Sequence, residues 1–129
     1  MRNLLISLGL VLLFASPALA IDFTVTGATL TVGYTEPTTN EDGSTLTDLD
    51  HTNVYVKVGN GAFVKGANIP ASKATGGGVI STPVNVTAPA HATTTVSLYA
   101  TATDTIGNES VPSVTVTKSI DRLSPASPQ

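Results

Sequence analysis

Apolar and polar residues alternate along several short stretches of the chain, and this alternation is its main structural signal. A period of two places every second side chain on one face of an extended strand, so each stretch predicts a half-buried β-strand. No window keeps the 3.6-residue apolar period of a helix. The predicted strands are Asp22–Thr26, Ala28–Tyr34, Val54–Val58, Ala62–Lys65, Val79–Ile80, Val84–Val86, Val96–Thr103 and Val114–Thr117.

Turn-forming residues separate these stretches. Residues 35–50 are a long polar turn region, residues 59–61 (Gly-Asn-Gly) read as a tight hairpin turn, and residues 66–78 are a Gly/Ala/Ser-rich loop. About seven short strands separated by turns predict an all-β, antiparallel β-sandwich. Val, Leu and Ala on one face of each strand would pack against the other sheet, while Thr on the opposite face tolerates water.

The first 20 residues, MRNLLISLGLVLLFASPALA, have the layout of a secretory signal peptide. Arg2 supplies a short positive region, residues 4–14 are uncharged and largely apolar, and Ala18-Leu19-Ala20 is a small-x-small cleavage site. The apolar stretch is shorter than the roughly 20 residues that a membrane span needs. We expect cleavage after Ala20 and a secreted product: extracellular, on the cell surface or in the periplasm.

Composition narrows the function classes. The net charge is −3 and no cluster of Lys and Arg exists, which disfavours nucleic acid and anionic membrane surfaces as partners. The chain contains no cysteine, so it offers no disulfide, thiolate nucleophile or Cys-ligated zinc. We expect one domain at residues 21–121, held together by its core, and a flexible C-terminal tail at residues 122–129.

Two stretches of the chain resemble the bacterial type of fibronectin type III module. "TVGYTEPTTNEDGSTLTDLD" is similar to the family's second strand, Pro-containing turn and acidic loop, and "YATATDTIGNESVPSVTVT" is similar to its last two strands. The resemblance implies an immunoglobulin-like sandwich over nearly the whole of residues 23–120. It places Tyr34 where a core Trp is usual, but Thr52 and Val96 where aromatic residues are usual. It implies nothing specific about a ligand.

The stretch "DTIGNESVPS", residues 104–113, is the first candidate binding site. Gly107 and Asn108 suit the positive φ angles of a turn, so the stretch is foremost a turn that fixes the register of two strands. Loops at the ends of a sandwich also recognise partners, which makes Asp104, Asn108 and Glu109 candidate ligand-binding residues. The chain has no Arg-Gly-Asp motif.

The exposed sheet faces are the second candidate site. Alternation predicts that Tyr55 and Tyr99 point outward, where they could contact a protein or glycan. The loop Glu41–Asp48 is a further candidate contact at one end of the sandwich.

Catalytic and metal sites have weaker support. Residues 36–50 carry five carboxylates beside a Gly turn, but the EF-hand spacing is absent, so a solvated turn is favoured over a calcium site. Every carboxylate is expected in a turn or on an outward face, without an apolar pocket to raise its pKa for catalysis. His51 and His91 lie far apart and have no third-ligand motif.

We therefore expect a non-enzymatic binding or adhesion-type module without a cofactor or metal, which recognises a protein or glycan. The alternative is a structural subunit of an extracellular assembly joined by strand edges, with the Val79–Ile80 stretch as a candidate edge for self-association.

Overall fold

The computed structural model describes residues 21–129, so the expected signal peptide at residues 1–20 lies outside the described residues. Seven strands and no helix form this part of the chain. The strands are β1 (Asp22–Thr26), β2 (Thr29–Thr35), β3 (Leu49–Val58), β4 (Val64–Pro70), β5 (Val79–Asn85), β6 (Thr93–Asp104) and β7 (Val116–Asp121). Within residues 21–129 there is accordingly no helix that could cross a membrane.

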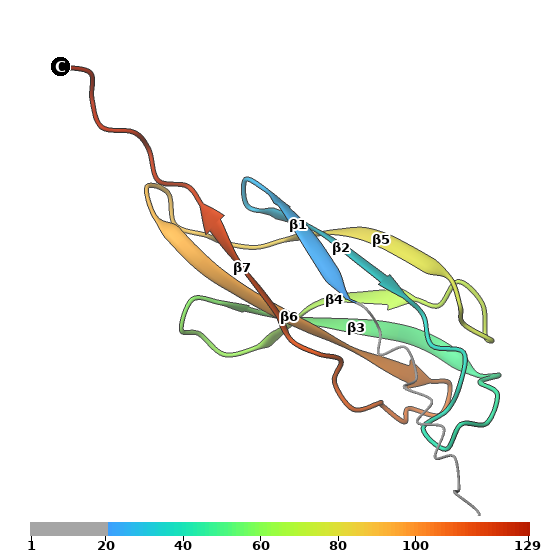
Figure 1. Cartoon of the computed structure of the whole chain (residues 1–129). Helices are drawn as coiled ribbons and strands as arrows, with labels where there is room; N and C mark the ends of the chain where they lie inside the picture. The colour runs from blue at the N-terminus through green and yellow to red at the C-terminus, as the bar shows by residue number, and fades with distance from the viewer. Residues whose placement is uncertain (1–20) are drawn as a thin grey trace, which may run out of the picture.

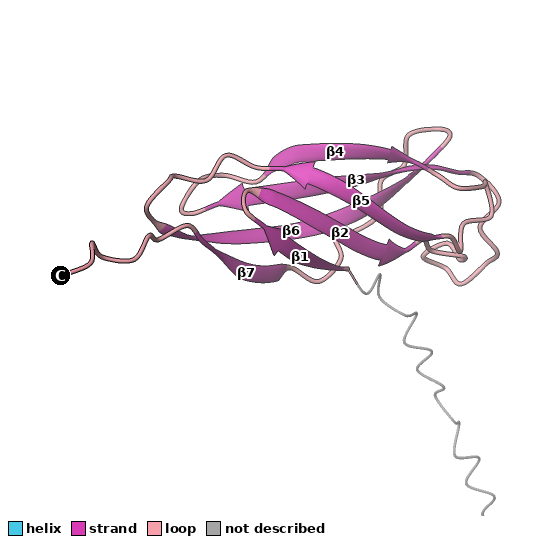
Figure 2. Ribbon diagram, turned by 90° about the horizontal axis from the view of Figure 1, so that it is seen from above, coloured by secondary structure: helices cyan, strands magenta, loops and turns pink. Residues whose placement is uncertain are grey.

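The strands form two antiparallel sheets that lie face to face (Figure 1 and Figure 2). One sheet has the order β1-β2-β5 and the other has the order β4-β3-β6-β7. The predicted all-β sandwich is therefore confirmed. Its seven strands in two antiparallel sheets are consistent with an immunoglobulin-like or fibronectin type III-like sandwich.

The hydrophobic core lies between the two sheets and follows the alternation in the sequence. On β2, for example, Leu30, Val32 and Tyr34 are buried, whereas Thr31 between them is exposed. The largest fully buried side chains are Phe23, Leu30, Leu98, Ile120, Val32, Val54, Val96 and Thr52. Because the chain has no cysteine, removing these apolar surfaces from water is the main force that holds the sheets together.

The edge strands β4, β5 and β7 differ from the prediction, and the central strands β3 and β6 begin earlier than predicted, at Leu49 and Thr93. β4 continues to Pro70, into the stretch predicted as a loop, and the two short stretches at 79–80 and 84–86 form the single strand β5. β4 and β5 bury few of their side chains, so the apolar residues that alternation depends on are sparse along them. Gly66 also makes β4 hard to recognise, because glycine is unusual within a strand. A Cβ at this position would lie 2.9 Å from Cγ2 of Val56, so the close approach of β4 to Val56 favours glycine.

Two buried hydroxyl groups occupy the core where the fibronectin resemblance would place aromatic residues. Tyr34 is 3% exposed and Thr52 is fully buried. Burial raises the pKa of Tyr34, and the Thr52 hydroxyl acts in the opposite direction. Neither hydroxyl makes a regular hydrogen bond to the described residues. These two groups are therefore a local weakness in an otherwise apolar core.

The buried carboxylate of Glu36 joins two loops at one end of the sandwich. Glu36 lies in the loop after β2, but it is only 2% exposed, so the expectation of a solvated turn is wrong for this residue. Its oxygens accept hydrogen bonds from the backbone N–H of Ser72 at 2.7 Å, from the Ser72 hydroxyl and from the N–H of Gly78 at 3.1 Å. These three donors compensate for the burial of the carboxylate and fix the glycine-rich loop before β5.

The third difference is β7, which begins at Val116, two residues later than predicted. The segment before it follows β6 without forming a regular strand. The backbone N–H groups of Ser110 and Ser113 donate to the carbonyls of Ala102 and Ala100, both at 2.8 Å. Their hydroxyls in turn accept the N–H groups of Ala102 and Ala100, both at 2.9 Å. The two serines thus replace a strand ladder around Pro112 and hold this segment along β6.

The first residues of the predicted tail contact the body of the domain. The N–H of Arg122 donates to the carbonyl of Ala92 at 3.0 Å, and its guanidinium donates to the carbonyl of Ala88. Nδ1 of His91 lies 3.0 Å from the Ser124 hydroxyl. The flexibility expected for residues 122–129 remains a prediction.

Candidate functional site

Three aromatic rings lie together on the outer face of the four-stranded sheet. Tyr55 on β3 and Tyr99 on β6 are direct partners in the antiparallel register. Their rings stack with centroids 4.9 Å apart and an interplanar angle of 22°. Phe63, just before β4, lies against Tyr99 at 4.8 Å with a tilt of 54°. Two of the rings carry a lysine: Nζ of Lys57 is 5.3 Å from the Phe63 centroid, and Nζ of Lys65 is 5.9 Å from the Tyr55 centroid.

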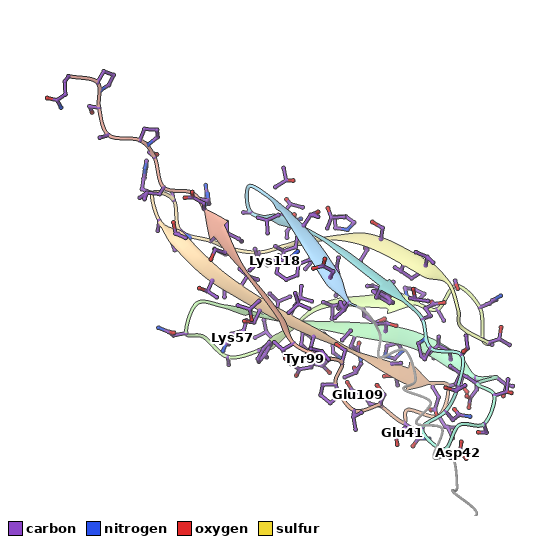
Figure 3. The ribbon with its side chains drawn as sticks, in the orientation of Figure 1. Glu41, Asp42, Lys57, Tyr99, Glu109 and Lys118 are labelled. Carbon is purple, nitrogen blue, oxygen red and sulfur yellow. The ribbon has the colours of Figure 1, made fainter. Side chains whose placement is uncertain are left out.

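Glu109 joins this aromatic cluster from the segment that precedes β7. It pairs with Thr103 in an isolated antiparallel bridge, which places its side chain over the outer face of the sheet. Oε1 of Glu109 accepts the hydroxyl of Tyr55 at 2.8 Å and the hydroxyl of Thr101 at 2.5 Å. In Figure 3, Glu109 and Tyr99 lie close together on this side of the molecule. The cluster thus combines aromatic rings with an oriented carboxylate.

The hydrogen bonds set the charge states of the cluster. The Thr101 and Tyr55 hydroxyls hold the pKa of Glu109 below its ordinary value of 4.5, and the nearby positive charge of Lys65 acts in the same direction. The hydrogen bond to Glu109 raises the pKa of Tyr55, because losing the phenol proton would leave two negative charges side by side. At neutral pH the cluster therefore carries an ionised Glu109 carboxylate and a neutral Tyr55 phenol.

An open hollow of about 330 Å³ lies beside the tyrosine pair. It is lined by Tyr55, Tyr99, Thr101, Glu109, Ser110 and Pro112. Its volume is at the low end of the range for small-ligand sites, so it fits one ring or one side chain rather than a large ligand. A second hollow of about 410 Å³ is lined by Lys57, by Gly59 and Asn60 of the turn after β3, and by four residues at the start of β6 (Thr93, Thr94, Thr95 and Ser97), and its lining includes neither a ring nor a carboxylate.

The structure brings three of the five predicted ligand-binding residues together and separates the other two. Tyr55, Tyr99 and Glu109 share one face. Asp104 and Asn108 instead bond to each other: Oδ2 of Asp104 accepts the Asn108 side-chain amide at 2.9 Å, and Oδ1 accepts the Asn108 backbone N–H at 2.9 Å. The side-chain bond from Asn108 is the main reason that the pKa of Asp104 is lowered.

The turn after β6 is thus closed on itself. Gly107 at φ 92° completes it, with its N–H donating to the carbonyl of Asp104 at 3.1 Å. Polar groups that satisfy one another offer less to a ligand, because a ligand would have to replace those bonds. The stretch "DTIGNESVPS" therefore divides into a self-contained turn, one carboxylate at the hollow, and two serines that hold the segment in place.

The acidic stretch at residues 36–50 does not converge on one point. Glu36 is buried against Ser72 and Gly78, Asp42 bonds to the hydroxyl of Ser44 at 2.5 Å, and Asp50 lies 2.6 Å from Nδ1 of His51. Within residues 21–129, no group of three or more His, Asp and Glu side chains is arranged to hold a metal ion. The loop carrying Glu41 and Asp42 reaches the end of the sandwich, away from Lys57 (Figure 3).

Sequence reasoning missed several members of the cluster. The positions of Thr101 and Lys57 could have been predicted, because each lies two residues from an outward-facing tyrosine and so shares its face. Phe63 and Lys65 lie inside the predicted strand Ala62–Lys65, but their place beside the tyrosines depends on the pairing of β4 with β3, whose register shifts between Val54 and Tyr55. The contact of Glu109 depends on how the segment before β7 folds back, and no local pattern encodes that.

Comparison with known proteins leaves the family open. No protein-family model matches the chain, and a search of curated proteins finds no match.

Proposed function

We propose that this protein is an exported, non-enzymatic binding module of the fibronectin type III-like kind, which recognises a partner through the outer face of its four-stranded sheet. The observation that carries the proposal is the clustering of Tyr55, Tyr99 and Glu109 beside an open hollow. Aromatic side chains are over-represented at recognition surfaces, because a rigid ring buries a large area at little entropic cost. The partner is a protein or a glycan.

The sheet face is a better candidate than the loops at the sandwich end. Asp104 and Asn108 satisfy each other, and the Asp42 carboxylate accepts both the hydroxyl and the backbone N–H of Ser44. The sheet face instead presents aromatic surface and the carboxylate of Glu109, which is bonded to Tyr55 on the sheet and not to residues of its own turn.

Two sequence features support the rest of the proposal. The layout of residues 1–20 supports export, and the order of the strands in the two sheets supports the fibronectin type III-like assignment. A non-enzymatic role is favoured because, among the described residues, Glu36 is the one buried carboxylate and its oxygens are occupied by three structural donors.

Assembly through strand edges is the second candidate, because Val79 on edge strand β5 is 85% exposed. The same strand argues against it. The N–H of Val86 donates to the carbonyl of Ala28, the residue before β2, so by alternation the backbone of Pro83 faces the free edge. Proline has no N–H to offer there, which interrupts any ladder with a further strand.

Arrays of peptides and glycans probed with purified protein test the proposal. We expect specific hits that are lost when Tyr55 and Tyr99 are both changed to Ala. A matched variant, Glu41→Gln/Asp42→Asn, alters the end loop and should keep them. Hits lost only in the loop variant would overturn the assignment of the site to the sheet face. Absence of hits together with self-association would favour assembly.

A further inference from the structure

Two of the three rings in the surface cluster have a lysine over them, and the third, Tyr99, has none within the described residues. Lys65 lies over Tyr55 and Lys57 lies over Phe63, as expected from the negative potential on the face of an aromatic ring. Lys118 lies in the same way over Phe23, a core residue of the other sheet. Of the three rings in the surface cluster, Tyr99 has no cation of residues 21–129 over it, and it lines the hollow together with Tyr55.

The hollow also contains a negative charge without a close counterion. Glu109 accepts two hydroxyls, but it forms no ion pair within 4.0 Å with any residue of the described chain. Neutral donors orient a carboxylate without cancelling its charge. The carboxylate of Glu109 is therefore fixed in orientation beside the tyrosine rings and keeps its negative charge.

The lysines of the cluster stand outside the hollow. No lysine or arginine is among the six residues that line it. Lys65 is on β4, and the strand order β4-β3-β6 places it on the far side of Tyr55 from Tyr99. An incoming cation in the hollow would thus meet the carboxylate of Glu109 and no lysine or arginine among the lining residues.

We propose that the hollow binds the side chain of an arginine presented by a partner protein, with the guanidinium stacked on Tyr99 and paired with Glu109. This inference rests on the proposed function of the sheet face. Arginine fits better than lysine, because its planar group stacks on a ring and offers several donors to a carboxylate at once. A neutral sugar would use the rings but would leave the charge of Glu109 without a counterion.

The test is an NMR titration of the purified protein with two short Gly/Ser peptides that differ only at their central residue. One carries arginine and the other carries citrulline, which has nearly the same shape but no charge. We expect the arginine peptide to shift the amide resonances of Tyr99, Thr101 and Glu109 and to bind about tenfold more tightly than the citrulline peptide. Raising the salt concentration should weaken it.

Two variants make the test specific. Glu109→Gln keeps the shape of the side chain and should lower the affinity for the arginine peptide about tenfold. Glu41→Gln removes the same charge from the end loop and should leave the affinity unchanged. Tyr99→Leu removes the ring while keeping an apolar side chain, and should weaken binding as well. The spread of amide resonances shows whether each variant is folded.

The possible failures are distinguishable. Equal binding of both peptides, or no shift with millimolar arginine peptide, overturns the arginine proposal. If a neutral oligosaccharide alone shifts the same resonances, the sheet face remains the binding site and only the ligand class is wrong. If the arginine peptide shifts the end loops and not β3 and β6, both proposals fail.

Discussion

Single residues in this chain are best understood from whether their polar atoms have partners. Glu36 is buried and fully used by Ser72 and Gly78, so its role is structural. Glu109 accepts hydrogen bonds from two hydroxyls on an open face, so its carboxylate remains accessible to a partner. Residue type alone does not separate these two glutamates. Their surroundings do, and those were hidden from the sequence because both contacts join distant segments.

The lowered pKa of Glu109 gives the first prediction. Changing Tyr55 to Phe removes a hydrogen bond to the carboxylate, so the pKa of Glu109 should rise toward its ordinary value of 4.5. Because the folded-state pKa is depressed, the stability that this carboxylate contributes is complete above its unfolded-state value. It is lost as the pH falls through the folded-state value. Carboxyl ¹³C NMR against pH measures the shift.

Tyr99→Phe is the control for this titration. No hydrogen bond joins the Tyr99 hydroxyl to Glu109, so the pKa of Glu109 should not move in that variant. A rise of equal size in both variants would show that the hydrogen bond from the Tyr55 hydroxyl is not what lowers the pKa of Glu109.

The buried hydroxyls of Tyr34 and Thr52 give the second prediction. Neither makes a regular hydrogen bond within the described residues, so the double variant Tyr34→Phe/Thr52→Val should raise the free energy of unfolding by about 1 kcal/mol or more. Urea denaturation measures this, with Thr31→Val at an exposed position of β2 as the control. A less stable double variant would mean that the two hydroxyls stabilise each other in solution.

At the scale of strands and loops, alternation predicted which way side chains point better than it predicted where strands begin and end. The central strand β3, for example, begins at Leu49 rather than at the predicted Val54. β1 has the predicted limits, and the outward positions of Tyr55 and Tyr99 follow from the period of two on β3 and β6. On β5, the polar run at residues 81–83 concealed a continuous strand. Before β7, serine hydroxyls replace backbone partners. In both places the deciding contacts are long-range, and a local pattern cannot contain them.

The glycine-rich loop before β5 gives the third prediction. Gly76 has φ 65°, and a Cβ there would lie 1.8 Å from the carbonyl oxygen of Pro37. Gly27 has φ 61° but no atom within 4 Å of such a Cβ. Gly27→Ala should therefore cost only the strain of a positive φ, about 1 kcal/mol. Gly76→Ala should cost clearly more, because the backbone must also move.

Thermal or urea unfolding of the two alanine variants provides the comparison. Similar losses of stability would show that the loop before β5 yields easily. The clamp between Glu36 and this loop would then contribute little to the fold.

At the scale of the whole molecule, the free edges and the free faces have different characters. The edge strand β5 carries Pro83, and the edge strand β7 carries Lys118, both of which discourage pairing with another chain. The outer face of the four-stranded sheet instead presents rings and an oriented charge. This contrast favours our proposal that a partner binds across the sheet face over assembly through strand edges.

This contrast gives the fourth prediction. Sedimentation velocity should find a monomer across a wide range of protein concentrations. Val79→Lys, which places a charge at the most exposed apolar position of β5, should leave the result unchanged. An oligomer that grows with concentration and disappears in the Val79→Lys variant would instead support assembly through strand edges.

We propose that the sheet face around Tyr55, Tyr99 and Glu109 is the recognition surface. The most direct test of this proposal is to map the amide chemical shifts of the protein on adding a peptide or glycan selected from the arrays. We predict that the perturbed amides lie on β3, on β6 and at residues 109–112. Perturbations confined to residues 36–48 and 104–108, or to β5, with β3 and β6 unchanged, would contradict it.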